Sequence, residues 1–399
     1  MKPTENSRLP WTILVSTWLL AFSMWTPMFC IPPMEHILKD ELALTHAQTS
    51  LLFTAPILMI IAASIPAGLL ADRIGVKKAA GIGAIIMTLG AILKATSTDP
   101  SSILAFTFLY GVGLAWSFTN LPKVVSLWVP PQRAGVATGL YSVGIFAGSG
   151  LPLAITMSII FPMTNSFQGV FLFWNIPPII ATATWWLLVK EPQQSSIHNK
   201  SVTKNTISLR RVLRNKNLWL VASFFILSNF FVFNWSAWAP SLLLLKGATP
   251  DSAGIFSSLF FWAAIPAAFL VPRLAYRIGL RKPFLWVPGI ILSFMSWWAV
   301  YANLTISWLI MVIVGIAHNT RFMSIMTLPV EIMPKEEVGV ATGFINSIGF
   351  IGGVIGPLVG GLVLDYTSSL DTSLLVLVGL SVAAAVVGLK LPETGPKGH

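Results

Sequence analysis

Uncharged stretches long enough to cross a lipid bilayer recur along the whole chain. Residues 9–34, 47–71 and 100–122, for example, contain no Asp, Glu, Lys or Arg. An α-helix needs about 20 apolar residues to span the hydrocarbon core. Charged residues make up 10% of the 399 residues, whereas a soluble domain carries about 25% to cover its surface. We therefore predict an all-α membrane protein; a soluble enzyme is excluded, and the single Cys30 excludes a secreted domain built on disulfides.

The charge-free gaps divide the sequence into twelve predicted transmembrane helices. Two of the gaps are long enough for a pair of helices, and the polar turns near Asn165 and Asn303 separate the members of each pair. The predicted spans are residues 11–34, 47–71, 79–96, 101–129, 135–160, 168–189, 217–243, 252–273, 284–302, 306–332, 337–364 and 372–390.

The basic residues are distributed very unevenly between the two sides of this arrangement. An even number of spans places both termini on one side, and the side with more Lys and Arg faces the cytosol. If the termini are cytoplasmic, only Lys39, Lys94 and Lys246 lie outside, while Lys123 and Arg321 lie within spans. We therefore predict a multi-pass protein of the cell membrane with cytoplasmic termini. The net charge of +11 then follows from topology, so we expect no nucleic-acid partner. We expect the protein to be a monomer in the lipid bilayer.

The two halves of the sequence show residual similarity. Arg-Ile-Gly at 73–75 recurs at 277–279, and Gly-Val-Ala-Thr-Gly at 135–139 recurs at 339–343, each time 204 residues later. The hydrophilic segment 190–216 separates the halves. Repeats of this kind are typical of transporters. We predict two pseudo-symmetric six-helix bundles, residues 1–189 and 217–399, joined by a cytosolic linker at 190–216.

Residues 68–78, Gly-Leu-Leu-Ala-Asp-Arg-Ile-Gly-Val-Lys-Lys, follow the second predicted span. Their Gly, Asp-Arg, Gly and basic residues resemble the motif between spans 2 and 3 of the major facilitator superfamily, and residues 272–282 form a degenerate second copy. Spans 1 and 2 also look like the nitrate, cyanate and organic anion porter branch. The resemblance extends over the whole chain and implies a secondary transporter that works by alternating access, with spans 1, 4, 7 and 10 lining a central cavity.

The same resemblance implies a gate that holds the cytosolic side shut. Asp72 is expected to meet Arg133 and the N-terminal end of span 11, where the helix dipole is positive. The gating residues that we expect are Asp72, Arg73, Gly75, Arg133, Arg277 and Glu331.

Two basic residues and a histidine fall inside the predicted spans, where ionisable groups are costly and usually functional. Arg321 lies about ten residues from the cytosolic end of span 10, roughly 15 Å deep, and His318 is one turn away. Lys123 lies roughly 9 Å inside span 4, on one face with Asn120 and Trp116. Lys123 could bind substrate, reach back into the cytosol or pair with Glu331.

No acidic residue falls at the middle of a predicted span. An unpaired guanidinium at that depth is costly, so the simplest partner for Arg321 is an anionic substrate that it grips with two hydrogen bonds. Among the aromatic residues Trp25, Trp235 and Trp238, which more often anchor a core, we take Trp25 and Trp238 as candidate walls of the site.

The sequence therefore predicts a secondary active or facilitative transporter of a small, carboxylate-like organic anion. Symport with a proton would use His318 or a proton bound with the anion, while uniport and exchange stay open. The alternatives are an exporter of amphipathic or aromatic compounds, an inorganic anion porter, and a receptor with the same fold. No metal-ligand spacing, nucleophile motif or phosphate-binding loop occurs, so we expect no enzyme activity, no metal and no cofactor.

Overall fold

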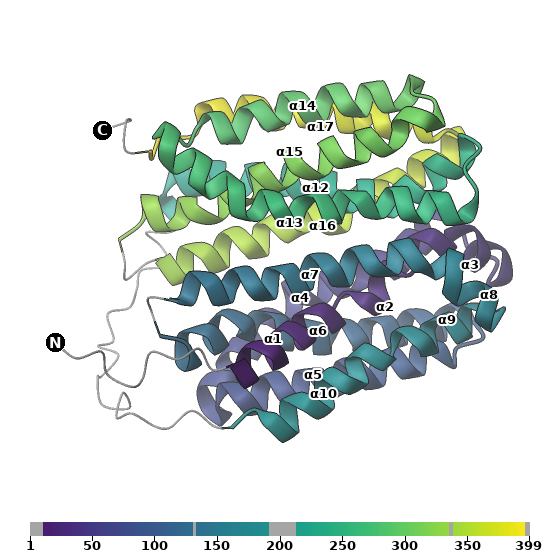
Figure 1. The fold of residues 1–399 in the computed structure, drawn as a ribbon, viewed down its shortest axis with the longest axis horizontal. Helices are drawn as coiled ribbons and strands as arrows, with labels where there is room; N and C mark the ends of the chain where they lie inside the picture. The colour runs from purple at the N-terminus through teal and green to yellow at the C-terminus, as the bar shows by residue number, and fades with distance from the viewer. Residues whose placement is uncertain (1–10, 131–132, 191–212, 335–337, 396–399) are drawn as a thin grey trace. The chain divides into compact units, whose positions relative to one another are not determined.

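The computed structural model describes residues 11–130, 133–190, 213–334 and 338–395, and this part of the chain contains helices and no strand (Figure 1). Twelve of its helical segments are long and apolar enough to cross a membrane, which confirms the predicted number of spans. These segments are Trp11–Glu41, His46–Ile74, Val76–Ala95, Pro100–Trp128, Ala134–Thr164, Phe167–Leu188, Lys216–Leu245, Pro250–Ala275, Pro283–Tyr301, Leu304–Pro329, Val340–Thr367 and Leu370–Lys390.

The chain divides into two compact units. The first unit comprises Met1–Pro192 with Ala239–Phe261, and the second comprises Gln193–Trp238 with Trp262–His399. These units differ from the expected bundles in the segment 239–261, which packs on the first unit: the Phe261 ring lies 5.1 Å from that of Phe29. Most of the expected linker 190–216 lies outside the described residues.

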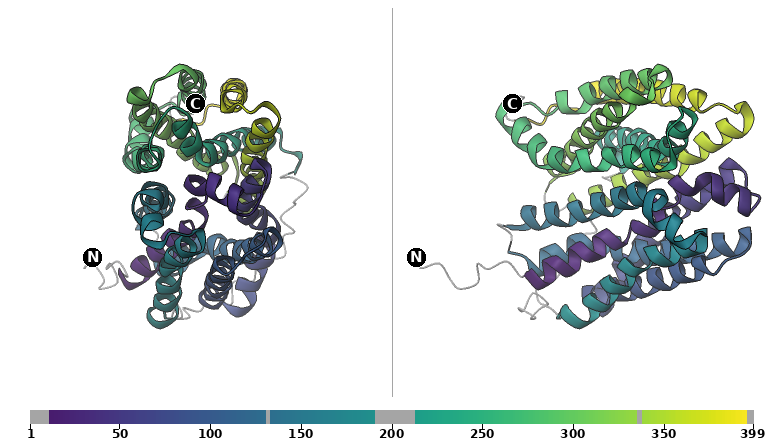
Figure 2. Two further views of the ribbon diagram at one scale, coloured as in Figure 1. Left: turned by 90° about the vertical axis from the view of Figure 1, so that its right-hand side faces the viewer. Right: turned by 45° about the vertical axis from the view of Figure 1, so that its right-hand side comes forward.

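The first unit contains the first six spans, and three of them are interrupted. Two further views show its helices running alongside one another (Figure 2). Its elements are α1 (Trp11–Ser23), α2 (Thr26–Phe29), η2 (Pro32–Met34), α3 (Glu35–Glu41), α4 (His46–Ile74), α5 (Val76–Ala95), α6 (Pro100–Trp128), α7 (Ala134–Ile155), η4 (Thr156–Ile160), α8 (Phe161–Thr164), α9 (Phe167–Trp174) and α10 (Ile176–Leu188).

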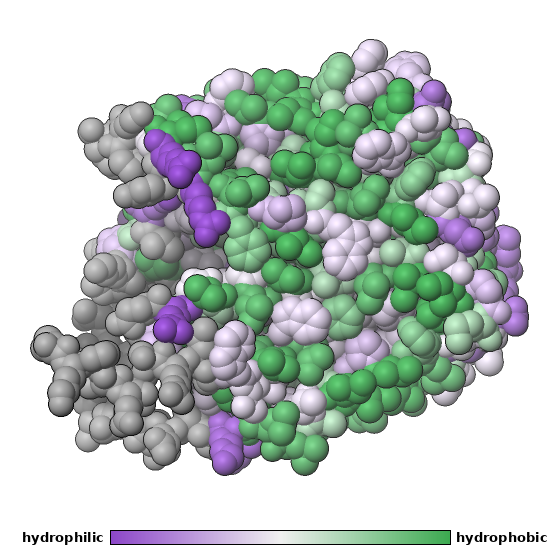
Figure 3. Space-filling view, viewed as in Figure 1, coloured by the Kyte–Doolittle hydropathy of each residue, from purple (hydrophilic) through white to green (hydrophobic). Residues whose placement is uncertain are grey.

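The second unit contains long helices, and the first two of these, α12 and α13, also supply the segment that belongs to the first unit. Its elements are α12 (Lys216–Leu245), α13 (Pro250–Ile278), α14 (Pro283–Tyr301), α15 (Leu304–Ile332), α16 (Val338–Thr367) and α17 (Leu370–Lys390). Apolar side chains cover the middle parts of the helices on the visible face, and hydrophilic side chains gather toward their ends (Figure 3). This is the surface that a bilayer requires.

The first span is not the continuous helix that we expected over residues 11–34. It breaks after Ser23 and again after Phe29, because Pro27 and Pro32 start new helical segments and cannot donate a backbone hydrogen bond. The break leaves backbone carbonyl groups without helical partners. The Tyr110 hydroxyl donates to the carbonyl oxygen of Met24, and the Nζ atom of Lys94 donates to that of Pro27 at 2.6 Å.

Lys94 therefore does not lie in the outer solution, as its place in the sequence suggested. It is 1% exposed, and its ammonium group lies 4.2 Å from the centroid of the Phe171 ring. The sequence prediction was wrong because the break in the first span, which offers Lys94 an acceptor inside the unit, is not visible from charge spacing.

Close helix contacts repeat in the two units with the spacing of the sequence repeat. A Cβ atom on Gly148 of α7 would lie 2.2 Å from the carbonyl oxygen of Phe22, and one on Gly352 of α16 would lie 1.9 Å from that of Ile226. Both residues of the second pair follow those of the first by 204 positions. Glycine at these two places lets the backbones of neighbouring helices approach closely. The internal repeat is thus a repeat of packing as well as of sequence.

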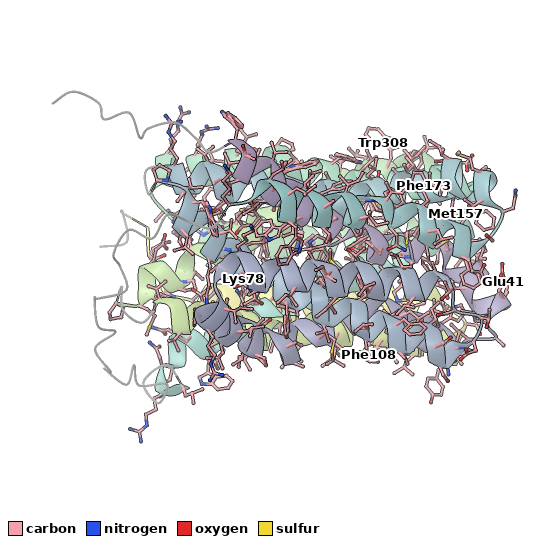
Figure 4. All side chains as sticks on the ribbon, turned by 90° about the horizontal axis from the view of Figure 1, so that it is seen from below. Glu41, Lys78, Phe108, Met157, Phe173 and Trp308 are labelled. Atoms are coloured by element: carbon pink, nitrogen blue, oxygen red, sulfur yellow. The ribbon has the colours of Figure 1, made fainter. Side chains whose placement is uncertain are left out.

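The two motif copies also form equivalent turns. Gly75 has φ +92° between α4 and α5, and Gly279 has φ +77° between α13 and α14. This backbone region favours glycine because it has no Cβ atom. Within the first unit, Lys78 just after this turn and Glu41 at the end of α3 lie toward opposite ends of the helices (Figure 4).

Candidate functional site

Arg321 lies on α15 in the interior of the second unit. It is 0% exposed, and its Nε atom donates a hydrogen bond to Oγ of Ser228 on α12 at 3.1 Å. The carbon at the centre of its guanidinium group lies 5.8 Å from the ring centroids of both Phe224 and Phe231. The cation is thus positioned by one hydroxyl and two aromatic faces, which attract it through their ring electrons.

The terminal nitrogen atoms of this guanidinium group have no partner. Nη1 and Nη2 are both buried and make no hydrogen bond within the described part of the chain. The ion pairs found there join Glu35 to His46, Asp72 to Lys123, and Glu331 to Arg281, so none includes Arg321. An uncompensated buried guanidinium is costly. These two donors therefore retain their full hydrogen-bonding capacity.

His318 lies one turn before Arg321 and belongs to a stack of rings. Its imidazole lies 6.4 Å from the Phe231 ring at 14° and 6.3 Å from the Phe322 ring at 23°. On Phe231 the indole of Trp235 also stacks, at 5.7 Å and 11°. The side chain of His318 is therefore held among aromatic rings beside the cation.

Lys123 is not directed at an open binding site. Its Nζ atom lies 2.6 Å from Oδ1 of Asp72 and donates a second hydrogen bond, at 3.1 Å, to the carbonyl oxygen of Gly68. Its expected partner Glu331 instead binds Arg281. The last two turns of α4 thus supply both acceptors of the Lys123 ammonium group, and the pair with Glu331 that we considered is not formed.

The other candidates in the first unit lie in its core. Asn120 is 0% exposed and donates from Nδ2 to the carbonyl oxygen of Trp116 at 2.7 Å, while its Oδ1 atom is buried without a partner among the described residues. Trp25, in the break of the first span, packs edge to face with Phe29 and Phe118, and its Nε1 atom is also buried and unpartnered within the described part. Both side chains therefore retain hydrogen-bonding capacity.

Trp238 contributes to helix packing in the second unit. Its Nε1 atom donates to the carbonyl oxygen of Pro357 at 3.2 Å, and its ring fills the space beside Gly360 on α16. Trp235, three residues earlier, has a buried Nε1 atom that makes no hydrogen bond with any described residue. Of these two tryptophans, Trp235 is the one that lies in the ring stack beside Arg321.

The residues that we expected to form the gate lie at helix ends in both units. Arg281 binds Glu331 through Nη2 at 3.0 Å, and Thr394 donates to the other carboxylate oxygen of Glu331. Asp72 pairs with Lys123 and not with Arg133, the partner that we expected. Arg73, Arg133 and Arg277 are exposed.

A second carboxylate joins the C-terminal segment to the motif copy in the second unit. Glu393 accepts hydrogen bonds from the backbone N–H groups of Arg281, at 2.6 Å, and Lys282, at 3.1 Å, and from that of Gly395. Its partial burial alone would raise the pKa of the carboxyl group. The backbone N–H donors outweigh this effect and hold the pKa of Glu393 below its ordinary value. Sequence reasoning missed Glu393 because the backbone groups that bind it lie 111 and 112 positions earlier in the chain.

Sequence reasoning also left Phe224, Ser228, Phe231 and Trp235 out of the site. These residues recur at intervals of four, three and four along α12, which places them on one helical face. That spacing was the available signal. In a helix that is apolar on all sides, however, it cannot be distinguished from the spacing of an ordinary core face.

Comparisons with known proteins agree with this fold. The structure resembles that of a bacterial homologue of the human lysosomal transporter Spinster, in an inward-facing and unoccupied conformation, with a TM-score of 0.79 and 17% identity over 96% of this chain and 97% of that one. In sequence, the chain is 23% identical to the uncharacterized transporter YycB of Bacillus subtilis (strain 168), over 92% of this chain and 90% of the relative.

Two further relatives have named substrates. The hexuronate transporter of Bacillus subtilis (strain 168) is 21% identical, over 88% of this chain and 87% of its own length. The cyanate transport protein CynX of Escherichia coli (strain K12) is 21% identical, over 86% of this chain and 87% of its own. The family model of the Major Facilitator Superfamily matches residues 13–247 and 231–399. With its twelve spans and both halves matched by this model, the chain is an integral membrane protein that belongs to the Major Facilitator Superfamily.

Proposed function

We propose that this protein transports a small organic anion of the carboxylate type across the cell membrane by alternating access. Arg321 is the principal anchor of the substrate. Both termini are cytoplasmic, as the distribution of basic residues indicates. The protein acts as a secondary active or a facilitative transporter, and His318, beside the anchor, is the residue through which a proton would be coupled.

One observation carries the proposal: the two terminal nitrogen atoms of Arg321 are buried without a partner among the described residues. A carboxylate offers two oxygen atoms at the spacing of these donors, so it can accept two parallel hydrogen bonds. The bound anion would also neutralise the charge, which the surrounding phenylalanine rings only partly stabilise. Because Arg321 is fully buried, the substrate reaches it only when the neighbouring helices separate.

Two of the relatives, the hexuronate and cyanate transporters, support an anionic substrate without specifying it. Hexuronate and cyanate are both anions, and they differ greatly in size and in the number of hydroxyl groups. At identities of 21% the substrate itself cannot be transferred. The shared property, a negative charge, matches the unpaired cation at Arg321.

The ion pairs at the helix ends suit the gating role. Each pair connects the region between two spans to the end of a third span: Asp72 pairs with Lys123, and Arg281 pairs with Glu331. We propose that these ion pairs keep the cytosolic end of each unit rigid while the units rearrange. The glycine contacts of Gly148 and Gly352 allow close helix packing during that movement.

A thermal-shift screen of the purified protein tests the proposal, because a ligand stabilises the state to which it binds. The panel holds monocarboxylates, dicarboxylates, nitrate, cyanate and an uncharged amphipath. We expect a carboxylate to raise the melting temperature of the wild-type protein and to have no effect on Arg321→Ala. Stabilisation by the uncharged amphipath that persists in Arg321→Ala would favour an exporter of amphipathic compounds and contradict the proposal. Stabilisation by nitrate or cyanate alone would favour an inorganic anion porter.

A further inference from the structure

The side chains around Arg321 restrict the shape of a bound substrate as well as its charge. Four planar side chains form a stack beside the cation, which we call the ring stack: Trp235 and Phe231 from α12, and His318 and Phe322 from α15. The angles between neighbouring rings are 11°, 14° and 23°, and their centroids lie 5.7, 6.4 and 6.3 Å apart. These are offset-stacked contacts, which are favourable between flat π-systems.

The ring stack and the cation share one member. The Arg321 guanidinium carbon lies 5.8 Å from the centroid of Phe231, the same ring on which Trp235 and His318 stack. A ligand whose carboxylate binds Nη1 and Nη2 must therefore place its remaining atoms close to a set of nearly parallel rings. A flat ligand can continue the stack, whereas a puckered or branched ligand can contact it only at scattered points.

Three of the buried hydrogen-bonding atoms at this place that lack partners among the described residues are donors. They are Nη1 and Nη2 of Arg321 and Nε1 of Trp235, each buried and unpartnered within the described residues. The hydroxyl of Ser228 already accepts from Nε of Arg321. A carboxylate brings acceptors only, and so does a ring nitrogen or ring carbonyl. A polyhydroxy acid also brings several O–H donors, which these three donor atoms cannot accept.

We infer that the substrate is a planar, aromatic monocarboxylate, whose carboxylate binds Arg321 and whose ring lies parallel to the ring stack. The inference rests on the proposed function, since it specifies the ligand of the same site. Trp235 is a specificity-determining residue: its indole extends the flat surface, and its Nε1 atom donates to a second acceptor where the ligand has one. Sugar acids such as hexuronates are poor ligands.

Three anions that each carry one carboxylate test whether the site selects a flat ring, any apolar ring or the negative charge alone. Benzoate and cyclohexanecarboxylate have the same carboxylate on a six-membered carbon ring, and only the ring of benzoate is flat. D-galactonate is an open-chain polyhydroxy acid. The dissociation constants of their sodium salts are measured by calorimetric titration of the full-length protein in detergent, with sodium chloride as the control for ionic strength.

We expect benzoate to bind about tenfold more tightly than cyclohexanecarboxylate, since the aromatic contact adds to the burial that both share, and more tightly still than D-galactonate. Trp235→Leu should reduce the benzoate preference to less than about threefold, and Trp235→Phe, which retains a flat ring, should keep it. Trp238→Phe is the matched control, because the indole of Trp238 is already bonded to Pro357, and it should leave all three affinities unchanged.

Two results would overturn the inference, and they differ in what they say about the proposed function. If cyclohexanecarboxylate or D-galactonate bound as tightly as benzoate, and binding were lost in Arg321→Met, the site would bind organic anions but would not select flat ones. If none of the three anions bound the wild-type protein, the inference and the proposed function would both fail. Because the wild-type comparison alone decides, a Trp235→Leu protein that does not fold leaves the test intact.

Discussion

The ammonium group of Lys123 lies 2.6 Å from the Asp72 carboxylate, and this pair joins the C-terminal end of α4 to the C-terminal part of α6. From the sequence, Lys123 was a candidate for substrate binding, whereas in the structure the Asp72 carboxylate and the Gly68 carbonyl occupy its ammonium group. The two side chains are 35% and 66% exposed, so the pair contributes about 0.2–1 kcal/mol to stability. The pair therefore contributes little to the stability of the fold, and we propose that it acts in conformational change.

The first prediction follows from that pair. Lys123→Gln should leave the dissociation constant of the anion unchanged and slow its transport into liposomes, because the variant weakens the gate and not the anchor. Asp72→Asn should slow transport to the same degree, and the double variant should be no slower than either single variant. A marked loss of anion affinity in Lys123→Gln would show that Lys123 belongs to the binding site after all.

The second prediction concerns helix packing in the second unit. Gly352→Ala should destabilise the protein by about 1–3 kcal/mol or more, because its Cβ atom would lie 1.9 Å from the Ile226 carbonyl oxygen and force two backbones apart. Gly343→Ala, where no atom lies within 4 Å of the added Cβ, is the control. The melting temperatures of both variants in detergent test this. Equal melting temperatures for Gly352→Ala and Gly343→Ala would contradict the close contact at Gly352.

The third prediction concerns the broken first span. Tyr110→Phe removes the hydroxyl that donates to the Met24 carbonyl oxygen, leaving a buried acceptor unpaired, and should lower stability by about 1–3 kcal/mol. Tyr301, which is 70% exposed, provides the matched control, since Tyr301→Phe should change stability by less than about 0.5 kcal/mol. A Tyr110→Phe protein as stable as the wild type would mean that the carbonyl finds another donor.

The fourth prediction concerns pH. The backbone N–H groups that surround Glu393 lower the pKa of its carboxyl group in the folded protein. A lowered pKa in the folded state means that the stabilisation is present at neutral pH and is lost as the pH falls through the folded pKa. Glu393→Gln should therefore lower stability by about 1 kcal/mol at pH 7 and lose less stability than the wild type on acidification to about pH 4. Glu41→Gln, at the exposed end of α3, should follow the wild-type profile; an unchanged profile in Glu393→Gln would contradict the assignment.

Most of the fold could be predicted from the sequence because a bilayer restricts a chain so strongly. Charge-free runs gave all twelve spans, and the repeat of Arg-Ile-Gly placed two equivalent turns, at Gly75 and Gly279. The breaks in the spans could not be predicted with the same certainty. Proline occurs inside intact helices here, as Pro56 does in α4, as well as at the break near Pro27, so proline alone does not identify a break.

The candidate site could be predicted only in part. Arg321 was identified because a charge inside a span is costly wherever it points. The surroundings of Lys123 and Lys94 could not be predicted, because their hydrogen-bond acceptors come from other segments: the Asp72 carboxylate for Lys123 and the Pro27 carbonyl for Lys94. Trp235 was passed over for Trp238 because the two lie close together on one apolar helix, and only the structure shows which indole is already bonded.

The central claim is that Arg321 binds the substrate. The most direct test is one comparison of wild type, Arg321→Lys and Arg321→Met, in which the dissociation constant of benzoate and the melting temperature are determined on the same preparations. Lysine keeps the charge without the two parallel donors, so it should bind benzoate more weakly than wild type but measurably. Methionine fills a comparable volume without a charge, so it should not bind benzoate, and its melting temperature should equal or exceed that of wild type, because a costly buried cation has been removed. An Arg321→Met protein that melts at a lower temperature yet binds benzoate with wild-type affinity would contradict the account, since Arg321 would then stabilise the fold and not bind the substrate.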